Sequence, residues 1–560
     1  MHIFFRGVFF VLLFSSFVFT QHPDPVRGKN GMIVSASKIA SEVGIQILKK
    51  GGNAIDAAVA VGFALAVTYP AAGNIGGGGF MVIHFNNGKS TSIDFREKAP
   101  MYSHEKMYLD SNGNFLPHLS QEGETSSGVP GSVAGLIYAL EKYGTLPLRE
   151  VIKPAIKLAE KGFILDYRLA QSINAFYSDF IRYPSSMKIF TKNGSKFEEG
   201  DRFIQKDLAK TLKLISKKGR DGFYKGEVAD KIVNQMRNSG GLITYEDLEN
   251  YKVVEREPII STFKGYKVVT MGPPSGGGVI LLQSLNLLEN FEFNKDEWNS
   301  SSYIHKLVET FKYAYADRSK HLGDSDFYPV PLIELLNKDY AQRIFAQIGE
   351  YATPSSQISP TEFPKYDESQ ETTHYSVIDK FGNAVSVTTT INSAYGAKVV
   401  VDGAGFLLNN EMDDFSAKPG EPNQFGLTGS EANKIEPGKR MLSSMTPTIV
   451  LKDDKAVLIL GSPGGSTIPT AVLQVVLNYL VFGMQVQAAV NSPRIHHQWL
   501  PDRIDFEDQA ILYDVKENLI KKNHVIGEKR ILGRVEAIAI ENGIFYGATD
   551  PRGYGGAVGY

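Results

Sequence analysis

Two adjacent hydroxyl side chains, Thr372 and Thr373, stand at the start of a stretch that could carry out acyl transfer. The segment before them, residues 353–365, is rich in proline and small polar residues, which resist packing into helix or strand and make a chain easy to cut. A cut before Thr372 would make it an amino terminus with its own general base. An α-amino group has a pKa of about 7.7–8.0, so near neutral pH part of it can accept the hydroxyl proton. The alternative is that Thr372 is an ordinary β-forming residue at a strand start.

Alternating residues after these threonines predict a β-hairpin. Residues 374–378 alternate, residues 379–383 form a turn, and residues 384–390 return. The same pattern predicts hairpins over 80–95 and 448–460, another near 253–269, and a strand over 535–540 that turns at 542–543. Candidate chemical residues cluster at the ends of these hairpins, where the edges of sheets can bring distant residues together.

Helical periodicity dominates elsewhere, and four consecutive glycines interrupt it. The glycines at 76–79 could cradle a phosphate, but no Lys-Ser/Thr pair follows them, so we favour close backbone approach at a strand entry. Helices are expected over residues 38–50, 53–68, 132–143, 149–161, 167–182, 206–218, 227–237, 301–322 and 468–482, with another ending near residue 290.

Three further groups could bind charge. Arg96 leaves the end of a predicted strand and can grip a carboxylate, although a salt bridge to Glu97 or another acid is the alternative. Gly464 and Gly465 precede a helix, where free N–H groups can bind an oxyanion, although a tight turn would need the same residues. An acidic run at 411–414 could be a solvated face; the twelve-residue pattern of a calcium loop is absent.

A pair of histidines, His496 and His497, invites a metal interpretation. No third ligand stands at a recognised spacing, so the sequence favours structural packing.

Five separated motifs in order resemble the γ-glutamyltranspeptidase family, also called glutathione hydrolases, which are N-terminal-nucleophile enzymes. The resemblance covers nearly the whole chain beyond its first two dozen residues. The motifs are DFREKAP (94–100), TTHYSV (372–377), LLNNEMDDFSAKPG (407–420), KRMLSSMTPT (439–448) and GSPGGS (461–466).

The resemblance implies a role for each matching residue. Thr372 is the nucleophile, Thr390 hydrogen-bonds it, and the N–H groups of Gly464 and Gly465 form the oxyanion hole. The residues implied for the substrate's α-carboxylate are Arg96, Ser443 and Ser444, and those for its α-ammonium are Asn392, Glu411 and Asp414. No cofactor and no metal are implied.

The resemblance also implies the architecture and the reaction. The expected fold is an α+β, four-layer αββα sandwich formed jointly by two autoprocessed fragments, a large one (21–371, with a flexible linker at 351–371) and a small catalytic one (372–560). The enzyme would cleave the γ-glutamyl amide of glutathione and pass the acyl group to water, an amino acid or a peptide. The alternatives are a cephalosporin-acylase-like amidase on the same fold and a processed, noncatalytic binding protein.

Two positions depart from the family pattern. Glu371 precedes the scissile bond where many bacterial relatives have an amide side chain. Phe425 stands where several relatives have a lid tyrosine, so it can cover the pocket but cannot donate a hydroxyl hydrogen bond to Asn392.

Composition sets the remaining limits. The 560 residues are 42% hydrophobic and 21% charged with a formal net charge of −2, which gives no reason to expect nucleic acid as a partner. The absence of cysteine excludes disulfides and thiolate chemistry. The apolar run at 7–19 after Arg6 predicts a secretory signal cut after about Thr20, and hence a bacterial periplasmic or extracellular protein. It is short for a membrane anchor.

Overall fold

Two seven-stranded antiparallel sheets form the centre of the computed structural model, which describes residues 23–359, 372–416 and 431–560. Sheet I has the order β19-β2-β10-β11-β3-β4-β7, and sheet II has the order β1-β18-β17-β13-β12-β9-β8. The strands of sheet I are β19 (Gly556–Gly559), β2 (Gly31–Ser35), β10 (Thr373–Asp379), β11 (Ala384–Thr390), β3 (Gly78–His84), β4 (Ser90–Asp94) and β7 (Val254–Arg256). Those of sheet II are β1 (Val26–Gly28), β18 (Ile544–Ala548), β17 (Glu536–Glu541), β13 (Lys455–Gly461), β12 (Thr448–Lys452), β9 (Tyr266–Thr270) and β8 (Ile259–Phe263).

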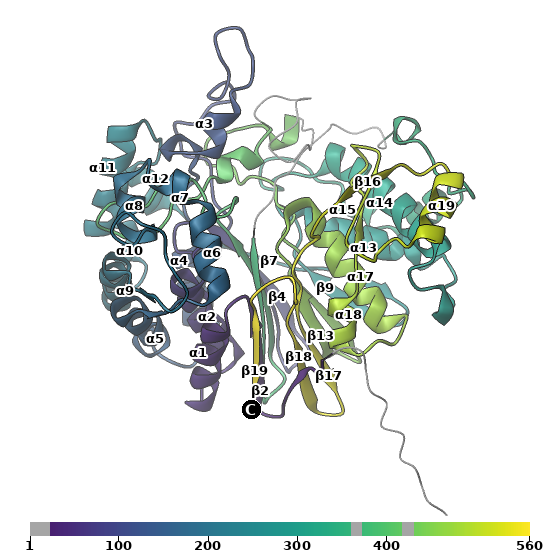
Figure 1. Cartoon of the computed structure of the whole chain (residues 1–560), viewed down its shortest axis with the longest axis horizontal. Helices are drawn as coiled ribbons and strands as arrows, with labels where there is room; N and C mark the ends of the chain where they lie inside the picture. Colours follow the sequence, from purple (N-terminus) through teal and green to yellow (C-terminus); the bar gives the residue numbers. More distant parts are fainter. Residues whose placement is uncertain (1–22, 360–371, 417–430) are drawn as a thin grey trace, which may run out of the picture.

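Helices cover the outer face of each sheet, so the molecule has four layers (Figure 1). On sheet I these are α1 (Lys38–Lys49), α2 (Ala54–Thr68), α4 (Ser132–Tyr143), α5 (Leu148–Lys161), α6 (Tyr167–Ala175), α7 (Tyr177–Phe180), α8 (Pro184–Phe190), α9 (Lys206–Lys218), α10 (Asp221–Tyr224), α11 (Glu227–Ser239) and α12 (Tyr245–Asn250). On sheet II they are α13 (Gly276–Leu288), α14 (Ser301–His321), α17 (Ile468–Leu480), α18 (Val486–Asn491) and α19 (Tyr513–Lys521). The αββα sandwich predicted from the sequence is confirmed.

Smaller elements complete the chain. The remaining helices are α3 (Pro117–Gln121), α15 (Leu332–Leu335) and α16 (Lys338–Phe345). Two minor sheets consist of β14 (Ile495–His496), β15 (Ile504–Phe506) and β16 (Ile526–Lys529), and of β5 (Phe163–Ile164) with β6 (Arg202–Phe203).

Two expected elements differ from the structure. The single helix expected over 167–182 breaks at Phe176, whose backbone leaves the helical region between α6 and α7. The hairpin expected over 253–269 is divided between the sheets: β7 joins β4 in sheet I, whereas β8 and β9 pair in sheet II. Pro258 stands between β7 and β8, where it cannot donate a ladder hydrogen bond.

Both sheets combine strands from before and after residue 372. In sheet I, β10 and β11 lie between β2 and β3, so the hairpin that follows Thr372 is central to the sheet. In sheet II, β12 pairs with β9 and β18 pairs with β1. The two parts of the chain therefore share one hydrogen-bonded core.

Successive side chains of β10 point to opposite faces of sheet I, one toward the covering helices and the other toward sheet II. Tyr375 and Val377 pack into the core beneath the helices, whereas Ile378 packs into the core between the two sheets. His374 also faces sheet II, because Gly461 at the end of β13 lies directly against its ring.

Among the described residues, no helix is both long and apolar enough to cross a bilayer. The predicted signal segment at 1–20 lies outside the described residues.

We expect Gly461→Ala to destabilise the protein, because a Cβ there would lie 2.4 Å from Nδ1 of His374. The ring cannot easily move, since its nitrogens hydrogen-bond to the hydroxyls of Thr388 (2.9 Å) and Ser376 (3.0 Å). Overpacking of this kind costs about 1–3 kcal/mol. Denaturant unfolding measures the loss, with Gly349→Ala as the control because a Cβ there meets open space. Equal stability of the two variants would contradict the packing argument.

Candidate functional site

Thr372 lies at the entry of the central hairpin and is almost fully buried, with 5% of its surface exposed. The two-residue repeat of β10 puts it on the same face as His374, toward sheet II. Thr373 faces the opposite side and is also buried, and its hydroxyl has no hydrogen-bond partner among the described residues. The two threonines therefore occupy different environments, and only Thr372 faces the end of sheet II.

The strand registers align four positions across sheet I. Extended to the strand ends, the pairing of β10 with β11, β11 with β3 and β3 with β4 places Thr372, Thr390, Gly78 and Arg96 side by side in that order. Neighbouring strands lie about 4.8 Å apart, so about 14 Å separates the backbones at the two ends of this row. The threonine hydroxyl and the arginine thus belong to one edge of one sheet.

A tight turn after β11 holds the hydroxyl of Thr390. The N–H of Asn392 donates to Thr390 Oγ1 over 2.7 Å, and Asn392 has a positive φ of 69°. The Asn392 amide in turn donates to the carbonyl of Asn410 over 2.8 Å. These contacts tie Thr390 to the segment that carries the acidic run.

The glycine run at 76–79 allows β3 to approach β11 closely. A Cβ on Gly77 would lie 2.0 Å from the carbonyl oxygen of Thr390, and one on Gly79 would lie 2.4 Å from that of Thr388. The prediction of close backbone approach is confirmed, and the glycines pack against β11.

Arg96 is buried at the centre of an ionic cluster. Its Nη1 lies 2.5 Å from Oε2 of Glu411 and 3.3 Å from Oε2 of Glu97, and its Nη2 pairs with Asp414. Glu411 and Asp414 come from a 3₁₀ turn, η4 (Glu411–Asp414), which continues the Asn410 segment. Arg96 was predicted to bind the substrate's α-carboxylate, and Glu411 and Asp414 its α-ammonium. The structure brings these residues together, and without substrate they bind each other.

The cluster contains one guanidinium and three carboxyl groups, and burial makes that arrangement costly. The pKa of Glu97 is raised well above its ordinary value, first because burial disfavours its charged form and second because Glu411 lies nearby. Neutral Glu97 would leave Arg96 to balance two carboxylates. Sequence reasoning treated Glu97 only as an alternative salt-bridge partner, and its position next to Arg96 in DFREKAP was the available signal.

Arg96 also anchors the loop that carries Ser443 and Ser444. Its Nε and Nη2 donate to the carbonyls of Met441 (3.3 Å) and Leu442 (3.1 Å). Both serines are buried at 2% exposure. Ser443 and Ser444, which were predicted to bind the substrate's α-carboxylate, thus directly follow the two residues whose carbonyls accept hydrogen bonds from Arg96.

Gly464 and Gly465 form a turn just beyond β13. Their φ angles are 129° and 55°, and a Cβ on Gly464 would lie 2.6 Å from Oγ1 of Thr467. The carbonyl of Gly464 accepts hydrogen bonds from the hydroxyl (2.7 Å) and N–H (3.1 Å) of Thr467. The turn begins only three residues after Gly461, which touches His374, so it lies at the same end of the sandwich as Thr372.

Asn74 is a positioning residue that sequence reasoning missed. Its amide donates to the carbonyl of Thr390 (2.9 Å) and its oxygen accepts from Gly77 N–H (2.9 Å) and the Ser132 hydroxyl (2.7 Å). Nothing in the sequence except its place before the glycine run pointed to it.

Two predicted functional residues, Glu371 and Phe425, lie outside the described residues, as does most of the predicted linker.

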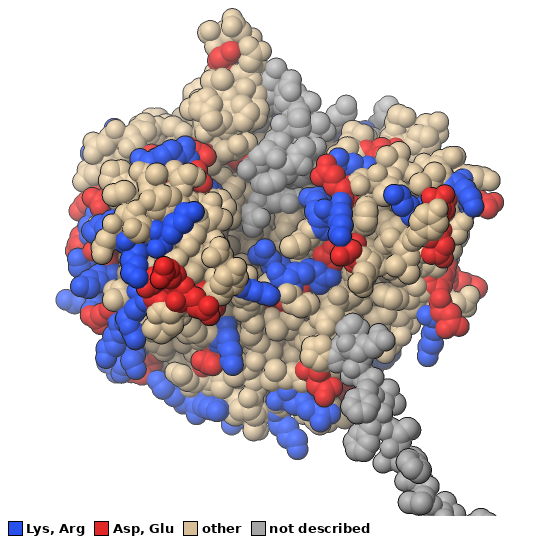
Figure 2. All heavy atoms as spheres, in the orientation of Figure 1, with Lys and Arg blue, Asp and Glu red and all other residues tan. Residues whose placement is uncertain are grey.

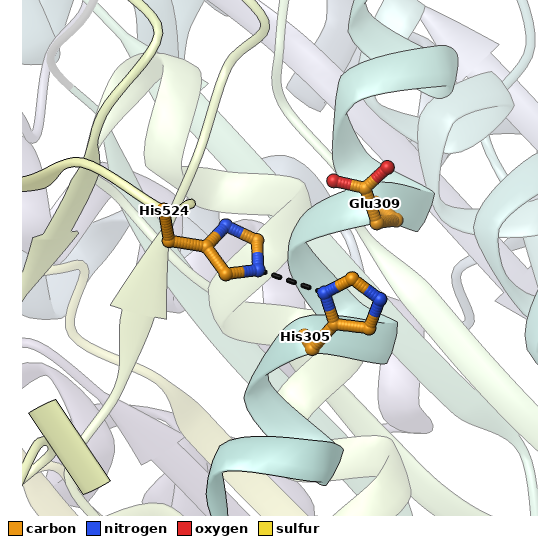
Figure 3. A group of neighbouring side chains, drawn as sticks. All are labelled: His305, Glu309 and His524. Carbon is orange, nitrogen blue, oxygen red and sulfur yellow. Dashed lines mark hydrogen bonds between the residues drawn. The ribbon is translucent and has the colours of Figure 1, made fainter. Parts of the chain in front are cut away.

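One group of potential metal ligands occurs in the described part of the chain: His305 and Glu309 on α14, and His524 after α19 (Figure 3). His305 Nε2 donates to the carbonyl of Gly349 over 2.9 Å, so His305 Nδ1 accepts from His524 Nε2 over 2.8 Å. Glu309 is paired with the ammonium of Lys312 at 3.0 Å. The contacts describe a neutral histidine pair beside an ion pair, which connects α14 with the chain after residue 372.

The histidine pair predicted to be structural is hydrogen-bonded in the core. His496 contacts the Thr470 hydroxyl (2.9 Å) and Gln498 Oε1 (3.0 Å), and His497 contacts Asp502 (3.1 Å). Burial lowers the pKa of His496 to about 3.

Comparisons with known proteins identify the family of this chain. The family model described as gamma-glutamyltranspeptidase matches residues 40–560. The chain is 50% identical over 531 residues to the glutathione hydrolase proenzyme of Escherichia coli (strain K12), covering 94% of this chain and 91% of that protein. A crystal structure of Helicobacter pylori gamma-glutamyltranspeptidase has a TM-score of 0.58 and 48% identity, covering 61% of this chain and 96% of that one. The cephalosporin acylase from Bacillus halodurans has a TM-score of 0.86 and 29% identity, with 98% of each chain covered.

We expect Arg96→Met to destabilise the protein strongly, because it leaves Glu411 and Asp414 buried without their cation. Removing one partner from a buried ion pair costs about 3–5 kcal/mol. Denaturant unfolding measures the loss. The matched control is Arg182→Met, whose ion pairs are solvent-exposed and should contribute less than about 1 kcal/mol. A loss at Arg96 no larger than at Arg182 would contradict the role of the cluster.

We also expect the buried histidines to contribute a fall in the free energy of unfolding as the pH drops from about 7.5 to about 5. Burial lowers the pKa values of His374, His496 and His524 to about 3, against about 6.5 in an unfolded chain. The folded state then binds fewer protons, so this stability is present above about pH 6.5 and declines below it, by up to about 2 kcal/mol per histidine at pH 5.

A non-titrating variant isolates one of these histidines. In His524→Gln the amide can still donate to His305 but carries no proton-binding site, so the slope of stability against pH should flatten. Urea unfolding at several pH values tests this, and an unchanged slope would refute the assignment of a neutral His524.

Proposed function

This chain belongs to the γ-glutamyltranspeptidase family, and from that premise we propose that it is an autoprocessing γ-glutamyl hydrolase and transferase with Thr372 as nucleophile. The observation that carries the proposal is the row across sheet I, in which Thr372 and Arg96 occupy the two ends of one aligned set of strand termini. An amino-acid head held at Arg96 would direct its side-chain carbonyl along this row toward Thr372.

Maturation begins with the hydroxyl of Thr372 attacking the carbonyl carbon of Glu371. The C–N bond breaks as a C–O bond forms, the released amine takes up a proton, and water hydrolyses the resulting ester. The products are a fragment ending at Glu371 and one beginning at Thr372. The new α-amine is then the general base of the mature enzyme.

In turnover, the Thr372 hydroxyl attacks the γ-carbonyl of a γ-glutamyl amide and gives its proton to the α-amine. The N–H groups of Gly464 and Gly465 stabilise the oxyanion, and the positive φ angles of this turn support that role. The leaving amine takes the proton as the acyl-enzyme forms. Water, an amino acid or a peptide then attacks the ester and restores Thr372. Thr390 orients the hydroxyl.

Recognition of the glutamyl head is an exchange of ion pairs. Its α-carboxylate replaces a carboxylate on Arg96 and is joined by Ser443 and Ser444, while its α-ammonium binds Glu411 and Asp414 with Asn392. The exchange conserves the number of opposite-charge contacts, which limits the cost of desolvating the zwitterion. Phe425 is proposed to cover the bound substrate.

The two fragments, 21–371 and 372–560, form a heterodimer in this proposal. It is supported by the sheets, since each contains strands from both parts and cleavage breaks no strand. The proposed substrates are glutathione and related γ-glutamyl compounds, with water, amino acids or dipeptides as acceptors. The segment 1–20 is proposed to direct export to a bacterial periplasm or the exterior.

The second candidate is a cephalosporin-acylase-like amidase, which the high structural similarity to such an enzyme supports. The Arg96 cluster favours the γ-glutamyl reaction, because it offers both charges that an α-amino acid head requires. Preference for acyl groups that lack this head would favour the acylase.

We predict that Thr372→Ala abolishes both chain cleavage and release of p-nitroaniline from γ-glutamyl-p-nitroanilide. Loss of the hydroxyl removes the nucleophile of both reactions. A denaturing gel, amino-terminal sequencing of the small fragment and the colorimetric assay check the result.

Thr373→Ala is the matched control. Its hydroxyl faces away from sheet II and has no hydrogen-bond partner among the residues described, so cleavage and activity should remain within about threefold. Turnover by Thr372→Ala would eliminate Thr372 as nucleophile. Loss of activity in both variants to the same extent would indicate a structural effect.

A further inference from the structure

We propose that the exposed sides of α5 and α9 form a basic surface that docks the protein on a membrane containing anionic phospholipids. The inference goes beyond the proposed function and does not depend on it, since no residue of the proposed active site lies on either helix. The ligand is a plane of phosphate-bearing lipid headgroups.

Positive charge is concentrated on these two helices. The basic surface consists of nine exposed side chains, Arg149, Lys153, Lys157 and Lys161 on α5 and Lys206, Lys210, Lys213, Lys217 and Lys218 on α9. The same helices carry three acids, Glu150, Glu160 and Asp207, so their net charge is +6. Because the whole chain has a formal net charge of −2, the remainder carries −8. The positive charge is therefore a local feature.

Helical spacing puts these cations on one side of each helix. On α5 they recur every four residues from Arg149 to Lys161, and on α9 they recur every three or four residues from Lys206 to Lys217. The other side of each helix packs into the core over sheet I, through Val151, Ile152, Ala155 and Ala159 of α5 and Leu208, Ala209, Leu212 and Ile215 of α9. The basic surface is thus the outward side of this helical layer.

The two helices lie against each other, so their cations cover an area. The N–H of Gln205, just before α9, donates to the carbonyl of Ala159 on α5 over 2.9 Å, and Lys213 pairs with Glu160 from one helix to the other. Helices of 14 and 13 residues are about 20 Å long, and packed helices lie about 8–10 Å apart. In Figure 2, Lys and Arg atoms gather at the left and lower left, over the elements that Figure 1 labels α9 and α5.

Most of the basic surface has no anionic partner in the protein. Asp207 pairs with Lys210 and with Lys188, which precedes α9 in the chain, and Glu160 pairs with Lys213. Within residues 23–359, 372–416 and 431–560, the other seven cations of the basic surface form no ion pair. These seven side chains can contact an external anion without breaking an internal contact.

The arrangement lowers the stability of the helices that carry it. Like charges four residues apart repel along a helix, as between Arg149 and Lys153 or between Lys213 and Lys217. Arg149 and Lys206 also stand in the first turn of their helices, where the positive end of the helix dipole disfavours a cation. Contact with a plane of phosphates would relieve both unfavourable interactions.

Two exposed isoleucines favour a lipid surface over a soluble polyanion. Ile164, 52% exposed, follows α5, and Ile204, 41% exposed, precedes α9. Apolar side chains beside a basic surface can enter the boundary between headgroups and acyl chains, whereas a soluble polyanion offers them no apolar contact. Anionic headgroups attract nearby cations over about a Debye length, about 8 Å at physiological ionic strength. The proposed export would bring the protein to such a surface.

Cosedimentation with large unilamellar vesicles tests the proposal. The protein is prepared from residue 21 onward, because the apolar run at 7–19 would bind vesicles whatever their charge. We expect binding to vesicles of phosphatidylcholine mixed with phosphatidylglycerol and none to phosphatidylcholine alone. Raising the salt from about 0.1 M to about 1 M should release the protein, because the Debye length falls from about 10 Å to about 3 Å.

Two variants of equal net charge locate the docking surface. They are Lys153→Gln/Lys157→Gln/Lys206→Gln/Lys217→Gln on the basic surface and the control Lys89→Gln/Lys295→Gln/Lys516→Gln/Lys521→Gln, and all eight lysines are exposed. Each cation near an anionic surface strengthens binding about fivefold, so the first variant should bind the mixed vesicles at least about 100-fold more weakly. The control should stay within about twofold of the unmodified protein, because its lysines lie beyond the reach of the docked headgroups.

A third variant, Ile164→Ser/Ile204→Ser, separates a lipid surface from a soluble polyanion. It should weaken binding to the mixed vesicles and leave binding to heparin unchanged. Tighter binding of the unmodified protein to heparin than to the vesicles would assign the basic surface to a polymer and overturn the proposal.

Three further results would overturn it. The first is no binding of the unmodified protein to the mixed vesicles. The second is equal weakening in the two lysine variants, because total charge and not this surface would then control binding. The third is a loss of stability in the first variant, measured by denaturant unfolding, since removal of like-charge repulsion should leave it at least as stable as the unmodified protein.

Discussion

The hydrogen-bond register of β10 with its neighbours is the constraint on which the site depends. β10 lies between β2 and β11, and β11 is followed by β3 and β4, so Thr372, Thr390, Gly78 and Arg96 lie at one level of sheet I. A slip of one residue in β10 would turn Thr372 toward the helices and bring Thr373 toward sheet II. The chemistry proposed for Thr372 therefore depends on strand pairing that buried side chains on both faces enforce.

Packing between the sheets supports that register at the end where the chemistry is placed. His374 fits against Gly461, and its two hydroxyl partners leave no ring nitrogen unsatisfied. The glycines of β3 admit the β11 backbone at distances that a side chain would prevent. Glycines and a neutral histidine thus stand where bulky apolar side chains would otherwise pack. Their hydrogen bonds and close backbone contacts keep this polar region ordered inside an otherwise apolar sandwich.

Charged side chains are concentrated in a few places in the structure. On the β3–β4 side, Arg96 is surrounded by carboxylates in a buried cluster, and burial raises the pKa of Glu97. Elsewhere, the cavity between α1, α2 and α6 is lined by Lys38, Arg168 and Arg534 and by one acidic side chain, Asp166.

The sequence by itself determined the hairpin after Thr372, the glycine approach at 76–79, most helices, and the motifs that indicated the family. These features are local, because alternation, glycine runs and capping residues predict structure from residues that are only a few positions apart in the chain. Only the tertiary structure decided that Arg96 binds Glu411 and Asp414 and that β7 leaves its expected hairpin for sheet I. Those relations join segments far apart in the chain, and they follow from strand order and burial, which no local pattern encodes.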